Sequence, residues 1–180
     1  MSQRNSGYVR KQGDLYQTPE WVTEALLSHV PNDIERVWEP AAGMGQMVHV
    51  LRRRYDVIPT DAMTGTDFLS VGTLAHFDTQ AIMTNPPYTL ATEFCTHAIR
   101  LMVGVGGVIA MLLRTDFDHA KSRTHLFRDC PAFAKKVVLM QRIVWFTGDD
   151  GKPKASPSFN HAWYIWNWRH AGAPTIAYGP

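Results

Sequence analysis

The sequence has few cysteines, almost no net charge and no long apolar run, and each shortage excludes a class of protein. Cys95 and Cys130 are the only cysteines, too few for a disulfide framework and too far apart for a CxxC metal pair. No apolar stretch approaches the roughly 20 residues of a membrane-spanning helix, and the polar N-terminus has no signal-peptide core. We therefore expect a cytoplasmic protein that holds no metal and has no membrane partner.

The basic residues leave the choice of partner open. The net charge of +2 is too small to indicate nucleic-acid binding by itself. The basic side chains form groups: arginines at 52–54, then Arg114, Lys121, Arg123 and Arg128, then Lys152 and Lys154. Each group is compatible with ordinary solvated surface. Groups that converge on one face would instead form a footprint for phosphates.

The length and the alternation of patterns predict one α/β domain. Residues 1–15 are expected to form a flexible polar arm, and residues 16–180 a single domain with one core. Strands are expected at 34–39, 56–60, 79–84 and 108–113, and helices at 18–30, 46–54, 90–102 and 116–129. The first helix is expected to have Thr18 as its N-cap and Pro19 at its first position. This alternation is typical of a Rossmann-like, doubly wound, mostly parallel sheet with helices on both faces. Residues 62–78 allow either a short third strand or a helix.

Two C-terminal segments, 135–146 and 159–168, are rich in β-branched and aromatic residues. They flank a Gly- and Pro-containing stretch at 148–153, which predicts a long antiparallel hairpin. In open α/β sheets, ligands bind at the carboxyl ends of the parallel strands. The residues that end each expected strand are therefore the first candidates for a site.

The first expected strand ends in Glu39-Pro40-Ala41-Ala42-Gly43-Met44-Gly45. Gly43 and Gly45 allow the backbone to turn sharply and to approach a ligand closely. Val48 stands where the dinucleotide fingerprint needs another glycine, so the pattern for NAD is incomplete. Asp61 ends the second strand, where a carboxylate can accept both ribose hydroxyls of a nucleoside cofactor. A surface carboxylate at a strand end is the alternative interpretation of Asp61.

Asn85-Pro86-Pro87-Tyr88 follows the buried run at 79–84. Two prolines end a strand abruptly, because proline has a fixed φ and no backbone N–H. The backbone carbonyls there and the Asn85 side-chain oxygen form a compact set of acceptors beside an aromatic ring. This arrangement suits a flat substrate with an exocyclic amino group. A simple turn is the alternative, since Asn and Pro are common turn residues.

Taken in this order, the motifs resemble those of S-adenosylmethionine-dependent amino-methyltransferases of the adenine-N6 type, over roughly residues 15–117. Tyr16-Gln17-Thr18-Pro19 resembles the N-terminal cofactor motif, and Asp67-Phe68 the motif that contacts the cofactor adenine. The resemblance implies the class I methyltransferase fold, a seven-stranded sheet whose last strand is inserted antiparallel. The cofactor residues that it implies are Tyr16, Thr18, Glu39, Pro40, Ala41, Gly43, Gly45, Asp61, Asp67, Phe68 and Asn85.

The same resemblance implies that Asn85, Pro86, Pro87 and Tyr88 are the catalytic motif. Tyr88, Arg114 and Phe159 are the candidates for target binding, although core packing is an alternative for Phe159. The chain has no room for the separate target-recognition domain that many DNA enzymes of this type carry. We expect methyl transfer to adenine N6 in DNA in preference to RNA. A protein-glutamine methyltransferase and a non-catalytic binding module are the alternatives, and the oligomeric state is not predicted.

Overall fold

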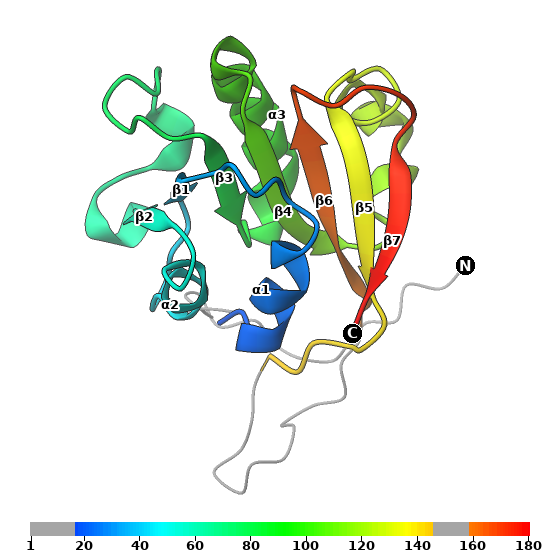
Figure 1. The fold of residues 1–180 in the computed structure, drawn as a ribbon, viewed down its shortest axis with the longest axis horizontal. Helices are drawn as coiled ribbons and strands as arrows, with labels where there is room; N and C mark the ends of the chain where they lie inside the picture. Colours follow the sequence, from blue (N-terminus) through cyan, green and yellow to red (C-terminus); the bar gives the residue numbers. More distant parts are fainter. Residues whose placement is uncertain (1–16, 146–158) are drawn as a thin grey trace, which may run out of the picture.

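The computed structural model describes residues 17–145 and 159–180 (Figure 1). The N-terminal arm at 1–15, Tyr16, the stretch at 148–153, Lys152 and Lys154 lie outside the described residues. Seven strands form one sheet: β1 (Arg36–Glu39), β2 (Asp56–Pro59), β3 (Ala81–Thr84), β4 (Val108–Arg114), β5 (Phe133–Leu139), β6 (His161–Asn167) and β7 (Thr175–Gly179). Three helices accompany them: α1 (Glu20–Leu27), α2 (Gln46–Leu51) and α3 (Ala91–Met102).

The strand order is β2-β1-β3-β4-β6-β5-β7. Strands β2, β1, β3 and β4 are parallel, so their carboxyl ends lie at one edge of the sheet. Strand β6 is inserted antiparallel between β4 and β5, pairing Arg114 with His161 at one end and Val108 with Asn167 at the other. This architecture is the mostly parallel seven-stranded sheet with an antiparallel insertion expected for the class I methyltransferase fold.

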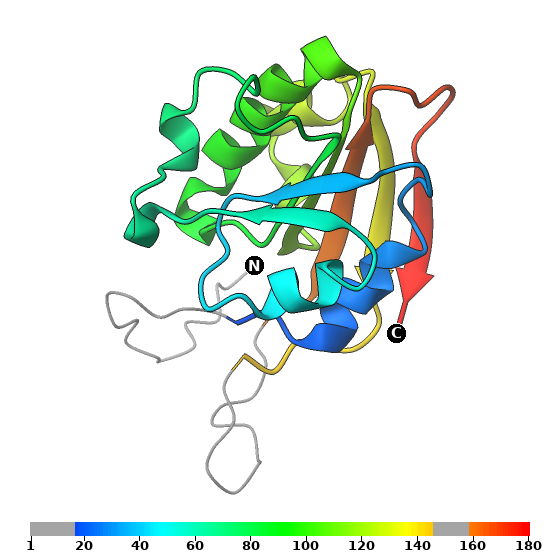
Figure 2. The ribbon, with the colours of Figure 1, turned by 60° about the vertical axis from the view of Figure 1, so that its left-hand side comes forward.

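Helices cover both faces of the sheet, as Figure 2 shows. On one face α1 and α2 bury Val22, Leu26, Met47 and Leu51 against the strands, including Trp163 of β6. On the other face α3 packs an apolar stripe against a second core. That second core contains Trp38, Phe68, Ile82, Phe94, Met111, Tyr164 and Trp166. Because both faces are covered, all four residues of β3 are buried.

The seventh strand does not come from residues 62–78, where the sequence allowed one. That stretch contains two short 3-10 helices, η1 (Ala62–Thr64) and η2 (Phe68–Ser70), and the edge strand is β7 instead. The inserted antiparallel strand is therefore the penultimate strand of the chain, and β7 follows it and runs parallel to β5. Ala177 packs against the first core, whereas Ile176 and Tyr178 are exposed. Because such an edge strand is only half-buried, its apolar pattern is weak, and β7 was not predicted from the sequence.

Two further boundaries were wrong. The expected helix at 116–129 consists of the 3-10 segments η5 (Phe117–His119) and η6 (Lys121–Leu126), because Asp, Ser, Thr and His are weak helix formers. Strand β5 ends at Leu139 and not at 146, since the N–H groups of Met140 and Gln141 donate to the Pro180 carbonyl. Two more 3-10 segments, η3 (Tyr88–Leu90) and η4 (Val103–Val105), flank α3.

Within the two described ranges, 17–145 and 159–180, no helix is long and apolar enough to cross a membrane.

Candidate active site

The candidate residues gather where the parallel strands end. Glu39 closes β1, Asp61 follows β2, Asn85 follows β3 and Arg114 closes β4. Because these strands are parallel neighbours, the four side chains start from the same edge of the sheet. Hydrogen bonds between the strand ends then decide which of them lie together.

Glu39 is buried, with 1% of its surface exposed. Its Oε1 accepts hydrogen bonds from the Ala41 N–H at 3.0 Å and from the Thr84 hydroxyl. Its Oε2 is buried and makes no hydrogen bond within the part of the chain that the structure describes. Burial raises the pKa of Glu39 to about 8, although the Thr84 and Ala41 donors act in the opposite direction. A buried carboxyl oxygen left in this state is a candidate ligand-binding atom.

The glycine loop is held against Asp61. The Gly43 N–H donates to Asp61 Oδ2 at 2.9 Å, and the Met63 N–H donates to Asp61 Oδ1 at 2.8 Å. Gly43 has φ 53° and Gly45 has φ 84°, both in the left-handed region that favours glycine. Asp61 therefore connects the loop after β1 to the end of β2. Each of its oxygens keeps one lone pair for a further donor.

Asn85 is oriented by a residue that precedes α1. Its Nδ2 donates to the Thr18 hydroxyl oxygen at 3.1 Å, and Thr18 is buried. The sequence suggested Thr18 as the N-cap of α1, but its side chain makes no capping hydrogen bond. Because Nδ2 faces Thr18, the amide oxygen of Asn85 faces away from Thr18. Thr84, the residue before Asn85, binds the buried Glu39 carboxyl.

The remaining residues of the two motifs support the backbone. Pro40 and Pro86 are buried, whereas Pro87 is exposed and its carbonyl accepts from the Leu90 N–H at 2.8 Å. The ladder between β3 and β4 stops at Thr84, directly before the two prolines. The prolines thus end the strand as predicted, and the chain continues into η3.

Asp67 and Phe68 contact their own turn and the core. Asp67 Oδ1 accepts from the Leu69 N–H and Oδ2 from the Ser70 hydroxyl, each at 3.0 Å. The Phe68 ring is 1% exposed and packs edge-on against Trp38 at 5.1 Å. The turn is joined to the site by the Thr66 N–H, which donates to the Asp61 carbonyl at 3.1 Å. The exposed Asp67 carboxylate, rather than the buried ring, is thus the part of this motif that a ligand could reach.

Aromatic rings gather around Tyr88. Tyr88 stacks on the His161 imidazole with centroids 5.7 Å apart and planes 26° apart. Trp145 meets the His161 ring edge-on at 5.3 Å and the Tyr88 ring at 6.3 Å. The sequence analysis assigned no role to His161 or Trp145, since an isolated His or Trp in a β-rich segment carries no signal for a site. Only the tertiary structure brings them to Tyr88.

Arg114 and Phe159, both predicted to bind the target, lie against each other. The Arg114 guanidinium lies 3.9 Å from the centroid of the Phe159 ring and also pairs with Asp116 at 2.7 Å. Because Arg114 pairs with His161 across β4 and β6, this pair borders the three aromatic rings. The two side chains form one amphipathic surface at the edge of the sheet.

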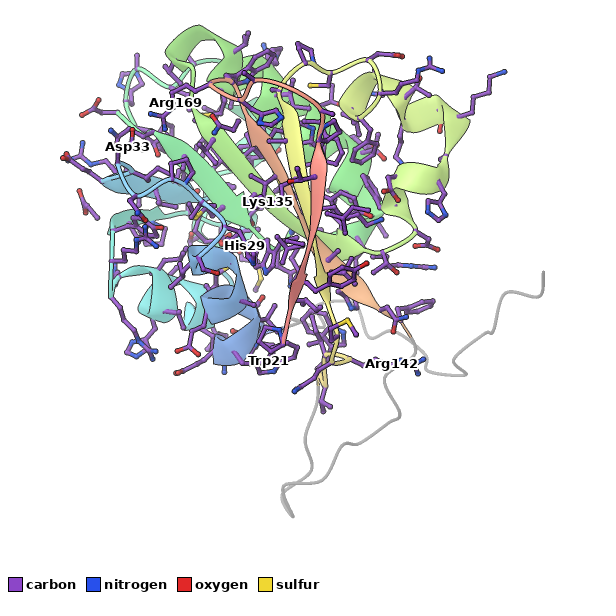
Figure 3. The ribbon with its side chains drawn as sticks, turned by 45° about the vertical axis from the view of Figure 1, so that its right-hand side comes forward. Trp21, His29, Asp33, Lys135, Arg142 and Arg169 are labelled. Atoms are coloured by element: carbon purple, nitrogen blue, oxygen red, sulfur yellow. The ribbon has the colours of Figure 1, made fainter. Side chains whose placement is uncertain are left out.

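The basic groups do not all converge on this edge. Arg53 pairs with Glu20 and Glu24, and so joins α2 to α1 instead of facing a ligand. Figure 3 shows Arg142 at the end of the sheet where β5 stops, and the Asp33–Arg169 pair at the opposite end. Arg142 donates to the Asn160 side chain at 2.9 Å, next to Phe159. Arg114 and Arg142 are thus two guanidinium groups at the site edge.

Within the described residues, no cluster of His, Cys, Asp and Glu has the arrangement of a metal site. A zwitterionic amino acid linked to a nucleoside requires both hydrogen-bond donors and acceptors. The site provides them through the glycine loop, the Glu39 Oε2 atom and the Asp61 carboxylate. These residues fit S-adenosylmethionine.

No protein-family model matches the sequence, and a search of the curated proteins finds no match. Solved structures do match the fold. A type I restriction-modification methyltransferase subunit of Streptococcus thermophilus has a TM-score of 0.62 at 12% identity, over 91% of this chain and 47% of that one. A Listeria monocytogenes protein assigned as a class I S-adenosylmethionine-dependent methyltransferase has a TM-score of 0.59 at 13% identity, over 94% and 67%.

A third similar structure is a modification subunit assigned to a type I restriction enzyme of Vibrio vulnificus, with a TM-score of 0.54 at 14% identity. It is matched over 91% of this chain and 46% of its own. The chain therefore spans about half the length of the two restriction-modification subunits. The chain has the class I methyltransferase fold.

Proposed function

We propose that the protein is an S-adenosylmethionine-dependent methyltransferase that acts on the N6 amino group of adenine in DNA. The observation that carries the proposal is the position of Asn85. Thr18 holds its amide, Thr84 just before it binds the buried Glu39, and Tyr88 three residues after it stacks on His161. Resemblance in fold to two DNA-modification subunits supports the choice of DNA.

The cofactor half of the site would bind through the chain's own acceptors. Glu39 Oε2 and the glycine loop would hold the amino-acid part, and Asp61 the ribose hydroxyls. A positive charge beside Oε2 stabilises the ionised form of Glu39 and lowers the pKa that burial has raised. When bound, S-adenosylmethionine supplies an electrophilic methyl group on a sulfonium.

The target half would prepare the amine. An exocyclic adenine amine is a poor nucleophile, because its lone pair is delocalised into the ring. The Asn85 amide oxygen would accept a hydrogen bond from the amine, favouring a tetrahedral nitrogen with a localised lone pair. It would also stabilise the positive charge that develops on nitrogen as the new C–N bond forms. The methyl–sulfur bond would break in the same step, and its electron pair would stay on sulfur as a neutral thioether. The extra proton then leaves to water. Tyr88 would stack on the base, which must leave the duplex to reach this edge.

The test is methyl transfer from radiolabelled cofactor to separated DNA, RNA and protein. Label in DNA, as N6-methyladenine after digestion, is the expected result. Asn85→Ala should retain cofactor affinity in calorimetry and lose about 3–4 kcal/mol of transition-state stabilisation, a rate loss of several hundredfold. Label found only in RNA, or only on protein glutamine, would show that RNA or protein is the substrate instead of DNA. Wild-type rates in Asn85→Ala would refute the site.

A further inference from the structure

His161 occupies an unusual position beneath the proposed target-binding ring. It is the first residue of β6 and is 2% exposed. Side chains alternate along a strand, so its ring lies on the same face as Trp163 and Ile165. From there it stacks on Tyr88 and receives the edge of Trp145. The imidazole is therefore the central ring of a three-ring cluster.

A hydrogen bond with the Phe159 backbone favours the protonated ring of His161, but burial outweighs it. Burial, and then the nearby Arg114 charge, lowers the pKa of His161 to about 4, so the ring is neutral at physiological pH. Its Nδ1 is buried and makes no hydrogen bond within the described ranges. Leaving a buried polar atom in this state is unfavourable, and native proteins rarely do so without a reason. What His161 does provide is a flat ring at a fixed place.

Tyr88 needs such a support. It begins η3, a single 3-10 turn outside the sheet, and its side chain is only half-buried. His161, by contrast, belongs to a seven-residue strand that pairs with β4 on one side and neighbours β5 on the other. A ring fixed on this strand can set the plane of a ring carried by a turn. A preset ring plane reduces the rotamer freedom that target binding must otherwise remove.

We propose that His161 is a positioning residue, which holds the Tyr88 ring in the plane where it stacks on the target base. The inference rests on the proposed function, because it concerns how the same site receives its target. His161 packs against one face of Tyr88. His161 itself would not touch the reacting atoms.

Three substitutions separate a stacking role from a purely structural one. His161→Phe keeps a flat ring, His161→Leu fills similar space without one, and His161→Ala removes both. The Ala and Leu variants should raise the KM for a DNA duplex by about two- to tenfold, the range for aromatic pairs, with kcat and cofactor affinity little changed. The Phe variant should behave as wild type. Trp166→Phe, a buried ring on the same strand but in the other core, is the matched control.

A second measurement does not depend on turnover. A duplex with 2-aminopurine at the target position reports stacking of the extruded base through its fluorescence, and the Ala and Leu variants should change that signal whereas Phe should not. In a Tyr88→Ala background, His161→Ala should have no further effect on either readout. If His161→Ala fails to fold, the comparison between Leu and Phe decides alone. Equal behaviour of Leu and Phe overturns the inference, whereas a wild-type protein that methylates no nucleic acid overturns the proposed function first.

Discussion

The two halves of the site are built from different interactions. Around Glu39 and Asp61 the strands are four residues long, and the parts are joined by hydrogen bonds between carboxylates and nearby backbone N–H groups. Around Tyr88 and His161 the supporting strands β4 and β6 are seven residues long, and rings pack on rings. The polar half is directional and depends on local turns. The aromatic half depends on how distant segments pair.

The difference predicts that each half can be disabled without the other. Gly43→Val should abolish detectable cofactor binding, because a β-branched residue at φ 53° is strained and must move the N–H that donates to Asp61. Isothermal titration calorimetry measures this directly. Gly72→Val is the matched control, since a Cβ there meets nothing within 4 Å. Wild-type affinity in Gly43→Val would mean that the loop does not line the cofactor site.

A change in the aromatic half should act on the target alone. Tyr88→Ala should weaken target binding by roughly 1–3 kcal/mol, the contribution of base–aromatic stacking, and leave cofactor affinity intact. Tyr88→Phe should keep most activity, because stacking requires the ring and not the hydroxyl. Single-turnover kinetics at varied DNA concentration separate binding from the transfer step. A Phe variant as impaired as the Ala variant would show that the hydroxyl, not the ring, matters.

Glu39 should make the stability of the folded protein depend on pH. In the folded protein without cofactor, Glu39 keeps its proton up to about pH 8, whereas its ordinary pKa is 4.5. The folded state therefore binds one more proton than the unfolded state between these values. The free energy of unfolding should fall with rising pH in that window, by at most about 1.4 kcal/mol per pH unit from this group.

Urea titrations of wild type and Glu39→Gln between pH 5 and pH 8, roughly the window just given, measure the effect. Glutamine has no proton to lose, so the difference in stability between the two proteins should change with pH in the stated direction. Parallel curves would show that Glu39 titrates near its ordinary value. Saturating cofactor should flatten the wild-type dependence, because a cationic group beside Oε2 favours the carboxylate.

The smallest expected effect is that of changing Thr18, which holds Asn85 between the polar half and the aromatic half. Thr18→Val removes the acceptor that holds the Asn85 amide and keeps the shape of the side chain. One neutral hydrogen bond contributes roughly 1 kcal/mol, so the transfer rate should fall about fivefold while both affinities stay near wild type. Thr18→Ser should restore the rate. A Val variant with the wild-type rate would indicate that the two prolines orient Asn85 without help.

Part of the polar half was predictable because two of its contacts are close in sequence. Glu39 binds the N–H of Ala41, and Asp61 binds that of Met63, each two residues ahead. Such turns are properties of short motifs, so residue type and spacing indicate them. Strands β1, β3 and β4 were predictable because each is a short apolar run that is buried almost throughout.

The aromatic half was predicted only in part. The sequence indicated Tyr88 and Phe159, but not the ring that supports Tyr88, because His161 and Tyr88 are joined only through the pairing of β4 with β6. Thr18 was assigned to the wrong partner, since a cap is a local interaction and the bond to Asn85 spans 67 positions. Strand β7 was missed because its exposed residues, Ile176 and Tyr178, blur the apolar pattern.

The insertion of β6 also sets the order in which the chain can assemble. The β2-β1-β3-β4 part of the sheet consists of segments that emerge early during synthesis, and their parallel pairs need nothing that comes later. Until β6 is made, β4 exposes a seven-residue apolar edge, the kind of edge that attracts other chains. A nascent chain at this stage has its cofactor loop and no support beneath Tyr88. The edge of β4 is therefore paired only once β6 has been made, and an unpaired edge of this kind favours aggregation of a partly folded chain.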